Sequence, residues 1–373
     1  MRRTLIALLV TSAACGHPAK STTPPAPLPE DKKAEPVAEA PKPVPVPQDP
    51  NPIDVPLAMG KATYKLASAG KGTKTVLKIS GEQGAPQQLE LALDLAGKQI
   101  APPELGGTQE DVAPTLVLAS ALEVGDSDKD GAKFKVTFNG VDARDRQGAK
   151  ATKDQFKTEL GVLAGVQLSG AVSPTGQLSN MSLHVDKPND KTMAALELIR
   201  ISMMPMWPIL PTEAIGVGAK WTVSTTYTIA DRIEATQTTD YEVLSHKGAE
   251  WKLKGTTKLA GKEQMIKETK FEKIGGAGGV EVTLTDGSFL PVSATKLAND
   301  FTATVSVPGG DPAKPSSVQF HLEQGLAVTP AGATPVTPPA TPVTPAAKTP
   351  AAPAAKAPAA TPPAKPAPAT PAK

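Results

Sequence analysis

The sequence lacks three features that would narrow its function at once. Its 373 residues contain one cysteine, Cys15, so a domain beyond that position has no disulfide, no thiolate metal site and no cysteine nucleophile. No apolar run approaches the roughly 20 residues that a membrane-spanning helix needs. The formal net charge is only +2, so the chain as a whole has no basic field that would attract nucleic acid. The sequence therefore predicts no membrane-spanning helix and no nucleic-acid partner.

The first sixteen residues, MRRTLIALLVTSAACG, have the composition of a secretory signal. Two arginines precede a short apolar run, and small residues lead to Cys15. This order resembles the signal of bacterial lipoproteins, in which the new N-terminal cysteine is lipidated, although Ser12 stands where leucine is usual. We therefore predict a signal peptide over residues 1–14 and acyl chains on Cys15. The alternative is an unmodified cysteine in a signal that is cut elsewhere, for example after Ala14 or Ala19.

The predicted lipid defines how the protein would meet a membrane. Two acyl chains on one cysteine anchor a protein stably, because each buried methylene contributes about 0.8 kcal/mol. Gly16 and His17 follow the cysteine, without the aspartate that commonly holds bacterial lipoproteins in the inner membrane. The resemblance therefore implies a protein of the bacterial cell envelope that is lipid-anchored at the outer membrane and faces the periplasm or the cell surface.

Proline is concentrated at both ends of the chain. Over residues 15–57 proline recurs every few positions and aromatic residues are absent, which predicts a disordered, semi-rigid tether. Residues 326–373 consist mostly of Ala, Pro, Thr and Lys and predict a second disordered tail. A weak contact of its lysines with cell-wall polymer or anionic lipid is the alternative. Residues 58–325 are long enough to bury a substantial core and form the predicted globular domain.

Alternation of one apolar with one polar residue dominates the middle of the chain. It runs through segments such as Gln88–Leu95, Lys133–Phe138 and Trp251–Leu259, and it is typical of strands with one buried and one solvated face. Val166–Val185 has two such arms around Ser173-Pro-Thr-Gly176, which is the signal of a hairpin. Long consecutive strands predict a mainly β (α+β) fold, with a curved antiparallel sheet or partial barrel of meander strands and two packed helices.

Two segments carry helical periodicity instead. Thr152–Ala164 starts with Thr152 and Gln155 at capping-box spacing. Asp190–Met204 ends at Pro205 and places apolar residues on one stripe, ahead of an apolar turn. Because methionine adapts to irregular partners, this helix and turn can line the mouth of a lipid-holding cavity, and core packing on the sheet is the alternative. The candidate ligand-binding residues are Met193, Leu196, Ile199, Met203 and Trp207.

The segment after the second helix resembles a known group of proteins. It reads Met206-Trp-Pro-Ile-Leu-Pro211 and then Ile215-Gly-Val-Gly-Ala-Lys-Trp221. A helix, a proline-bounded apolar turn and a Val-Gly-x-x-Trp opening of a long strand resemble a family of functionally uncharacterised, β-rich bacterial lipoproteins, over Val166–Leu259. The resemblance implies a folded extracytoplasmic domain and brings no catalytic residues.

One stretch has metal-ligand spacing. Asp126, Asp128 and Asp130, followed by glycine, match the first half of a calcium loop. The twelfth position is Thr137 rather than glutamate, so a solvated hairpin turn is the preferred interpretation and weak calcium binding the alternative. Gly275–Gly279 is rich in glycine but lacks the lysine and the helix that a phosphate-binding loop needs, so we expect it to be a flexible turn. The histidines are scattered and no Gly-x-Ser-x-Gly sequence occurs, so we predict no cofactor and no catalytic residue.

The sequence leaves two functions open for a lipid-anchored, non-catalytic protein. The first is a binding module that holds a lipid or other apolar ligand between the concave face of the sheet and the Asp190–Met204 helix. The second is a structural or assembly protein of the envelope, whose well-packed domain contacts protein partners. A cavity of several hundred Å³ favours the first function, on the order of known ligand sites, and a filled core with an exposed apolar edge favours the second.

Overall fold

The computed structural model describes residues 51–57, 59–81, 83–128, 131–202, 206–229, 232–267, 269–305 and 315–331, all within one compact unit. Cys15, the predicted signal peptide and most of the two predicted tails lie outside these residues. No helix in the described ranges is long and apolar enough to cross a membrane.

The strands are β1 (Ile53–Pro56), β2 (Thr63–Ser68), β3 (Lys71–Thr75), β4 (Gln87–Ile100), β5 (Gln109–Val112), β6 (Thr115–Asp128), β7 (Gly131–Arg144), β8 (Gln167–Val172), β9 (Leu178–Val185), β10 (Ile215–Val217), β11 (Lys220–Ile229), β12 (Ile233–Lys247), β13 (Glu250–Ala260), β14 (Gln264–Ile266), β15 (Thr269–Thr285), β16 (Val292–Val305) and β17 (Ser316–Pro330). The helices are η2 (Pro103–Leu105), α2 (Lys153–Leu160), η3 (Gly161–Leu163) and α3 (Asp190–Ser202).

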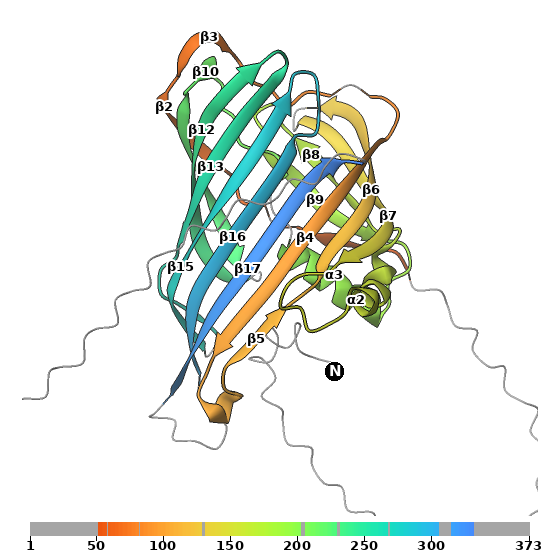
Figure 1. Ribbon diagram of the computed structural model, residues 1–373, viewed down its shortest axis with the longest axis vertical. Helices are drawn as coiled ribbons and strands as arrows, with labels where there is room; N and C mark the ends of the chain where they lie inside the picture. Colours follow the sequence, from red (N-terminus) through yellow and green to blue (C-terminus); the bar gives the residue numbers. More distant parts are fainter. Residues whose placement is uncertain are drawn as a thin grey trace, which may run out of the picture. The chain divides into compact units, whose positions relative to one another are not determined.

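Fifteen strands form one antiparallel sheet (Figure 1). Its path is β1-β9-β8-β7-β6-β4-β17-β16-β15-β13-β12-β11-β2, with β5 beside β4 and β14 beside β15. Two meanders make up the sheet. The first runs from β4 to β9 and the second from β11 to β17, and they join where β17 pairs with β4. The predicted mainly β fold with antiparallel meander strands is confirmed.

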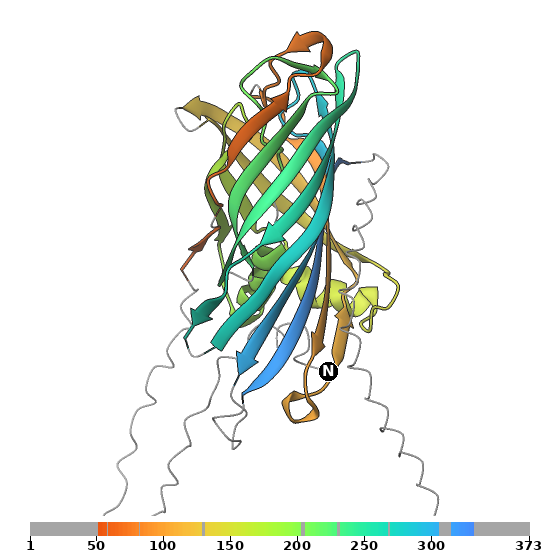
Figure 2. The same ribbon diagram turned by 90° about the vertical axis from the view of Figure 1, so that its left-hand side faces the viewer.

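The sheet is open and strongly curved. Its path ends at β1 on one side and β2 on the other. The hydroxyl of Tyr227 on β11 donates a hydrogen bond to Gln324 on β17 at 2.8 Å, although five steps between neighbouring strands separate β11 from β17. On a flat sheet those steps would add up to about 24 Å. The sheet therefore curves until side chains from distant strands meet across its interior, and Figures 1 and 2 show this curvature.

The two predicted helices are confirmed. The amide of Gln155 donates to the hydroxyl of Thr152 at 3.2 Å, and the amide of Thr152 donates to the side chain of Gln155 at 3.2 Å, as the capping-box spacing predicts. Helix α2 and the adjoining η3 contact β7, while α3 contacts η3, β4 and β17. The side chain of Asn189 accepts hydrogen bonds from two amides in the first turn of α3. The helices thus pack mainly on the first meander.

The folded domain is longer than the predicted range of residues 58–325. Ile53–Pro56, which we had assigned to the tether, forms β1 and pairs with β9. At the other end β17 continues to Pro330, and Val328 is fully buried opposite Leu91. Both strand ends adjoin proline-rich sequence, which is unusual within a sheet, so they were assigned to the tails. β1 is an edge strand with one neighbour, and β17 pairs with β4 from the far end of the domain, so neither pairing has a local sequence signal.

The predicted turn at Gly275–Gly279 is wrong, since these residues lie inside β15. A Cβ atom on Gly276 would lie 2.3 Å from the carbonyl oxygen of Ala298, and one on Gly278 would lie 2.2 Å from that of Lys296. Both carbonyls belong to the neighbouring strand β16. Glycine is required here because the two backbones approach closely where the sheet curves.

The edge strand β1 is linked to β9 by a histidine. His184 Nδ1 lies 2.9 Å from Asp54 Oδ1 across this strand pair, and His184 Nε2 lies 3.1 Å from Asp186 Oδ1. These two hydrogen bonds raise the pKa of His184 above its ordinary value of 6.5. The contact is therefore strongest when the imidazole is protonated.

Candidate binding cavity

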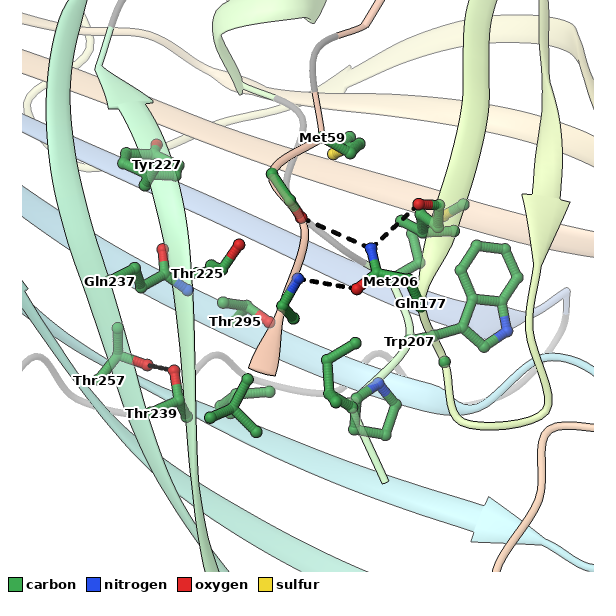
Figure 3. Close-up of a pocket in the computed structure, with 18 of the residues that line it drawn as sticks. Met59, Gln177, Met206, Trp207, Thr225, Tyr227, Gln237, Thr239, Thr257 and Thr295 are labelled. Atoms are coloured by element: carbon green, nitrogen blue, oxygen red, sulfur yellow. Dashed lines mark hydrogen bonds between the residues drawn. The ribbon is translucent and has the colours of Figure 1, made fainter. Parts of the chain in front are cut away.

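A cavity of about 130 Å³ lies in the interior of the curved sheet, beside the second meander. Inward residues of β11, β12, β13, β15 and β16 line one part of it. The apolar loop Met206–Ile209 lines another part, and the segment that follows β1 lines a third. Figure 3 shows the polar side chains of β11–β13 on one side and Met206 and Trp207 on the other. The cavity has two unlike walls.

The apolar wall is held by two tryptophans. Trp207 donates its indole N–H to the carbonyl oxygen of Phe289 at 2.8 Å, and Trp221 donates to the carbonyl oxygen of Ile209 at 2.8 Å. Met206 and Trp207 are each 2% exposed. These bonds satisfy both buried indoles and fix the loop at two points along its length.

Two further contacts fix the same loop. The Trp207 ring lies 4.8 Å from the ring of Phe134 and 5.6 Å from that of Phe289, measured between ring centroids. On the other side, a Cβ atom on Gly176 would lie 2.0 Å from the carbonyl oxygen of Pro208, so the β8–β9 turn approaches the loop too closely for any other residue. The loop that forms the apolar wall is therefore held by contacts from two sides.

Polar residues form the opposite wall, because they interrupt the inward face of the second meander. On β11, Thr225 and Tyr227 lie between Val223 of the larger apolar cluster and Ile229 of a smaller one. The same interruption recurs on the neighbouring strands, since the strand register aligns the inward positions. The other residues of this polar layer are Gln237, Thr239 and Tyr241 on β12, Thr257 on β13, Thr295 and Asn299 on β16 and Gln324 on β17, of which Asn299 and Gln324 do not line the cavity itself.

Part of the polar layer satisfies its own hydrogen bonds. The hydroxyls of Thr239 and Thr257 lie 2.9 Å apart, and both side chains are 4% exposed. Gln324 accepts hydrogen bonds from Tyr227 and from the Nδ2 of Asn299, at 2.8 and 3.2 Å. Burial raises the pKa of Tyr227 to about 12, so its phenol remains protonated and able to donate. Asn299 is fully buried, and its Oδ1 has no partner among the described residues.

A short segment, Met59–Ala62, closes one side of the cavity, and we call it the strap. It connects the two edges of the sheet, because β1 precedes it and β2 follows it. The amide of Ala62 donates to Gln177 Oε1 at 2.8 Å, and Gln177 Nε2 donates to the carbonyl oxygen of Gly60 at 3.5 Å (Figure 3). A Cβ atom on Gly60 would lie 2.2 Å from the carbonyl oxygen of Thr226, so glycine lets the strap pass close to β11.

The lining contains one charged residue among those that the structure describes, Arg200 on α3. Its Nε lies 3.1 Å from Glu197 Oε2 and its Nη2 lies 2.7 Å from Glu197 Oε1. This two-pronged contact neutralises the guanidinium within the helix. The cavity therefore offers uncharged polar groups and apolar surface.

Of the candidate ligand-binding residues, Trp207 lines the cavity. Leu196 and Ile199 are buried in the larger apolar cluster, 2% and 0% exposed, without lining it. Met193 is 41% exposed, and Met203 lies outside the described residues. The polar wall was not predicted from the sequence. Its signal there is the Thr- and Gln-rich composition of β11 and β12, which places polar residues at inward positions.

Two of the three aspartates with calcium-loop spacing, Asp126 and Asp128, lie at the end of β6. Asp126 accepts a hydrogen bond from Gln83, Asp128 forms an ion pair of 3.0 Å with Lys133, and Asp130 lies outside the described residues. Across the part of the chain that the structure describes, no three His, Cys, Asp or Glu residues are grouped so that they could hold a metal ion.

Comparison with known proteins adds no relative. No protein-family model matches the sequence, and a search of curated proteins finds no match.

Proposed function

We propose that this chain is a lipid-anchored lipoprotein of the bacterial envelope whose β-rich domain is a non-catalytic binding module. Its ligand is a lipid or another partly apolar molecule, and part of that ligand enters the cavity between Met206–Ile209 and the second meander. The observation that carries the proposal is the cavity with one apolar and one polar wall. Protein interiors normally pair their polar groups and fill their volume, so an interior that leaves both requirements unmet supports a binding role.

The size of the cavity limits what it holds. Its volume of about 130 Å³ is close to that of an engineered cavity of roughly 150 Å³ that binds benzene. Sites for whole drug-sized molecules measure about 300–1,000 Å³. The cavity therefore suits one benzene-sized part of a ligand.

The same volume favours the second candidate function, an assembly scaffold that binds protein partners. Two apolar clusters of buried side chains occupy much of the interior among the described residues, as expected for a domain whose role is to present a surface. The experiment below separates the two functions.

Native mass spectrometry tests the binding role directly. The full chain carrying Cys15→Ser, purified gently from its source, should retain or take up a lipid-sized mass that is lost on denaturation. Ile209→Trp places a large ring in the cavity wall and should abolish that mass. Leu244→Trp, at a position that is 52% exposed, is the matched control and should leave it unchanged. A bare protein mass, with no uptake of added lipid, would remove the binding role and leave the scaffold.

The lipid anchor needs its own experiment. Cell fractionation should place the wild-type chain with membranes and Cys15→Ser in the soluble fraction, because the acyl chains supply the membrane affinity. A Cys15→Ser chain that stays with membranes would contradict the anchor at this residue.

A further inference from the structure

Three polar groups face the cavity without a protein partner. They are the amide of Gln237, the hydroxyl of Thr295 and the phenol of Tyr241, and none of them hydrogen-bonds to another side chain or to the backbone among the described residues. Tyr241 stacks on Trp221 with 5.3 Å between ring centroids, which fixes the position of its ring. Figure 3 shows Gln237 and Thr295 on the polar side of the cavity. Elsewhere in the layer Thr239 and Thr257 pair with each other, whereas these three groups remain available to a ligand.

All three groups are uncharged, which limits their partner. An amide both donates and accepts, as does a hydroxyl, so they suit an alcohol, an amide or an ester equally well. Burial raises the pKa of the Tyr241 phenol, so this group stays neutral. The one charged residue of the lining, Arg200, already holds Glu197 in a two-pronged contact. A carboxylate or phosphate in the cavity would lose its hydration and find no free countercharge among the lining residues that the structure describes.

We infer that the cavity binds the uncharged, hydrogen-bonding end of a neutral amphiphile and rejects carboxylates and phosphates, an inference that rests on the proposed ligand-binding function. The hydrogen-bonding group lies against Gln237 and Thr295, and the adjoining apolar part lies against Met206 and Trp207 across the cavity. Alcohols, amides and esters with a short apolar body are the chemical class.

Three probes of nearly equal size separate the contributions. Benzyl alcohol is neutral and forms hydrogen bonds, toluene is neutral and forms none, and benzoate is charged. Isothermal titration of the full chain carrying Cys15→Ser should give the tightest binding for benzyl alcohol. Toluene should bind about threefold to tenfold more weakly, because it leaves the polar wall unpaired. Benzoate should bind at least about tenfold more weakly than benzyl alcohol, because its charge is buried without a partner.

Substitutions in the polar wall test which residues produce the preference for benzyl alcohol over toluene. Gln237→Leu and Thr295→Val should each reduce the advantage of benzyl alcohol over toluene while toluene still binds. Thr238→Val, on the opposite face of β12, is the matched control and should leave the advantage unchanged. Circular dichroism of each variant establishes that it is folded, and Thr295→Val serves alone if Gln237→Leu does not fold.

These outcomes separate the preference for neutral ligands from the proposed ligand-binding function on which it rests. If benzoate binds as tightly as benzyl alcohol, the preference for neutral ligands is wrong and the binding role stands. The same conclusion follows if both polar-wall variants keep the full preference. If none of the probes binds and native mass spectrometry finds no bound lipid, the binding role itself fails.

Discussion

The two meanders face the same interior and line it differently. The inward positions of the first meander are apolar along most of each strand, whereas those of the second meander alternate between apolar clusters and a polar layer. Helices α2 and η3 contact the first meander, and the cavity lies beside the second. Strands of both meanders carry the same period-two pattern, so the pattern specifies the sheet. The kind of side chain at the inward positions then decides whether a region is packed with apolar side chains or borders a cavity with polar ones.

The largest effect is expected from the packed meander. Leu118 on β6 is fully buried in the larger apolar cluster, and Leu118→Ala should lower the free energy of unfolding by about 2–5 kcal/mol, because the cavity it leaves cannot fully collapse. Chemical denaturation followed by circular dichroism measures this. Leu244→Ala, at a 52% exposed position, is the control and should change stability by less than about 0.5 kcal/mol. Equal effects at the two positions would contradict the packing of the first meander.

The polar layer should respond in a different way. Thr239→Val leaves the buried hydroxyl of Thr257 without its partner and should cost about 1–3 kcal/mol. The double substitution Thr239→Val and Thr257→Val removes both hydroxyls together and should cost close to nothing, because two apolar groups of the same shape replace them. A double-mutant cycle in the same denaturation assay checks this. Additive costs would mean that the two hydroxyls do not depend on each other.

A smaller effect is expected at the helix that covers the first meander. Thr152→Ala removes the N-cap of α2 and should lower stability by about 1 kcal/mol. Thr158→Ala, within the same helix, removes only a bond to the carbonyl oxygen of Asp154 and should be close to neutral. Both variants should leave probe binding unchanged, since neither residue lines the cavity. If Thr152→Ala alters probe binding, the packing of α2 on the first meander and the cavity beside the second meander are coupled more strongly than the contacts indicate.

The smallest effect concerns the edge of the sheet. The folded-state pKa of His184 is raised, so its contribution to stability is fully present below the unfolded pKa of about 6.5 and is lost as the pH rises through the folded value. Hydrogen-exchange protection of the β1 amides, corrected for intrinsic rates, should therefore fall over that pH range. His184→Gln should remove the dependence. Protection that falls equally in this variant would assign the change to another group.

Sequence reasoning predicted the local features of this fold and missed the long-range ones. The capping box at Thr152, the hairpin around Ser173–Gly176 and the strand alternation are encoded within short segments, and each is confirmed. The pairing of Gly325 with Asp94 joins residues far apart in the chain, and no local pattern signals it. The joining of the two meanders into one sheet depends on that pairing.

The candidate site shows the same limit. Trp207 was predicted because an apolar turn with tryptophan is a local signal, and it lines the cavity. Gln237 and Thr295 were missed because a polar residue on a strand is ordinarily taken to face solvent, and only the sheet register places these two inward. Met193 was assigned to the ligand stripe from helical spacing alone, which does not say which residues of that stripe are buried, and Met193 is exposed.

The pairing of β17 with β4 also constrains how the domain reaches its native state. The strand that joins the two meanders is the last one in the described part of the sequence, and its partner is among the first in the sheet. Until β17 is present, β4 and β16 each keep an unpaired edge, the kind of surface that recruits other chains into aggregates. Such a topology closes late and folds slowly, because distant contacts must form before they contribute stability. A chain cut before Ser316 would lose this joining strand and expose two long edges in place of a single continuous sheet.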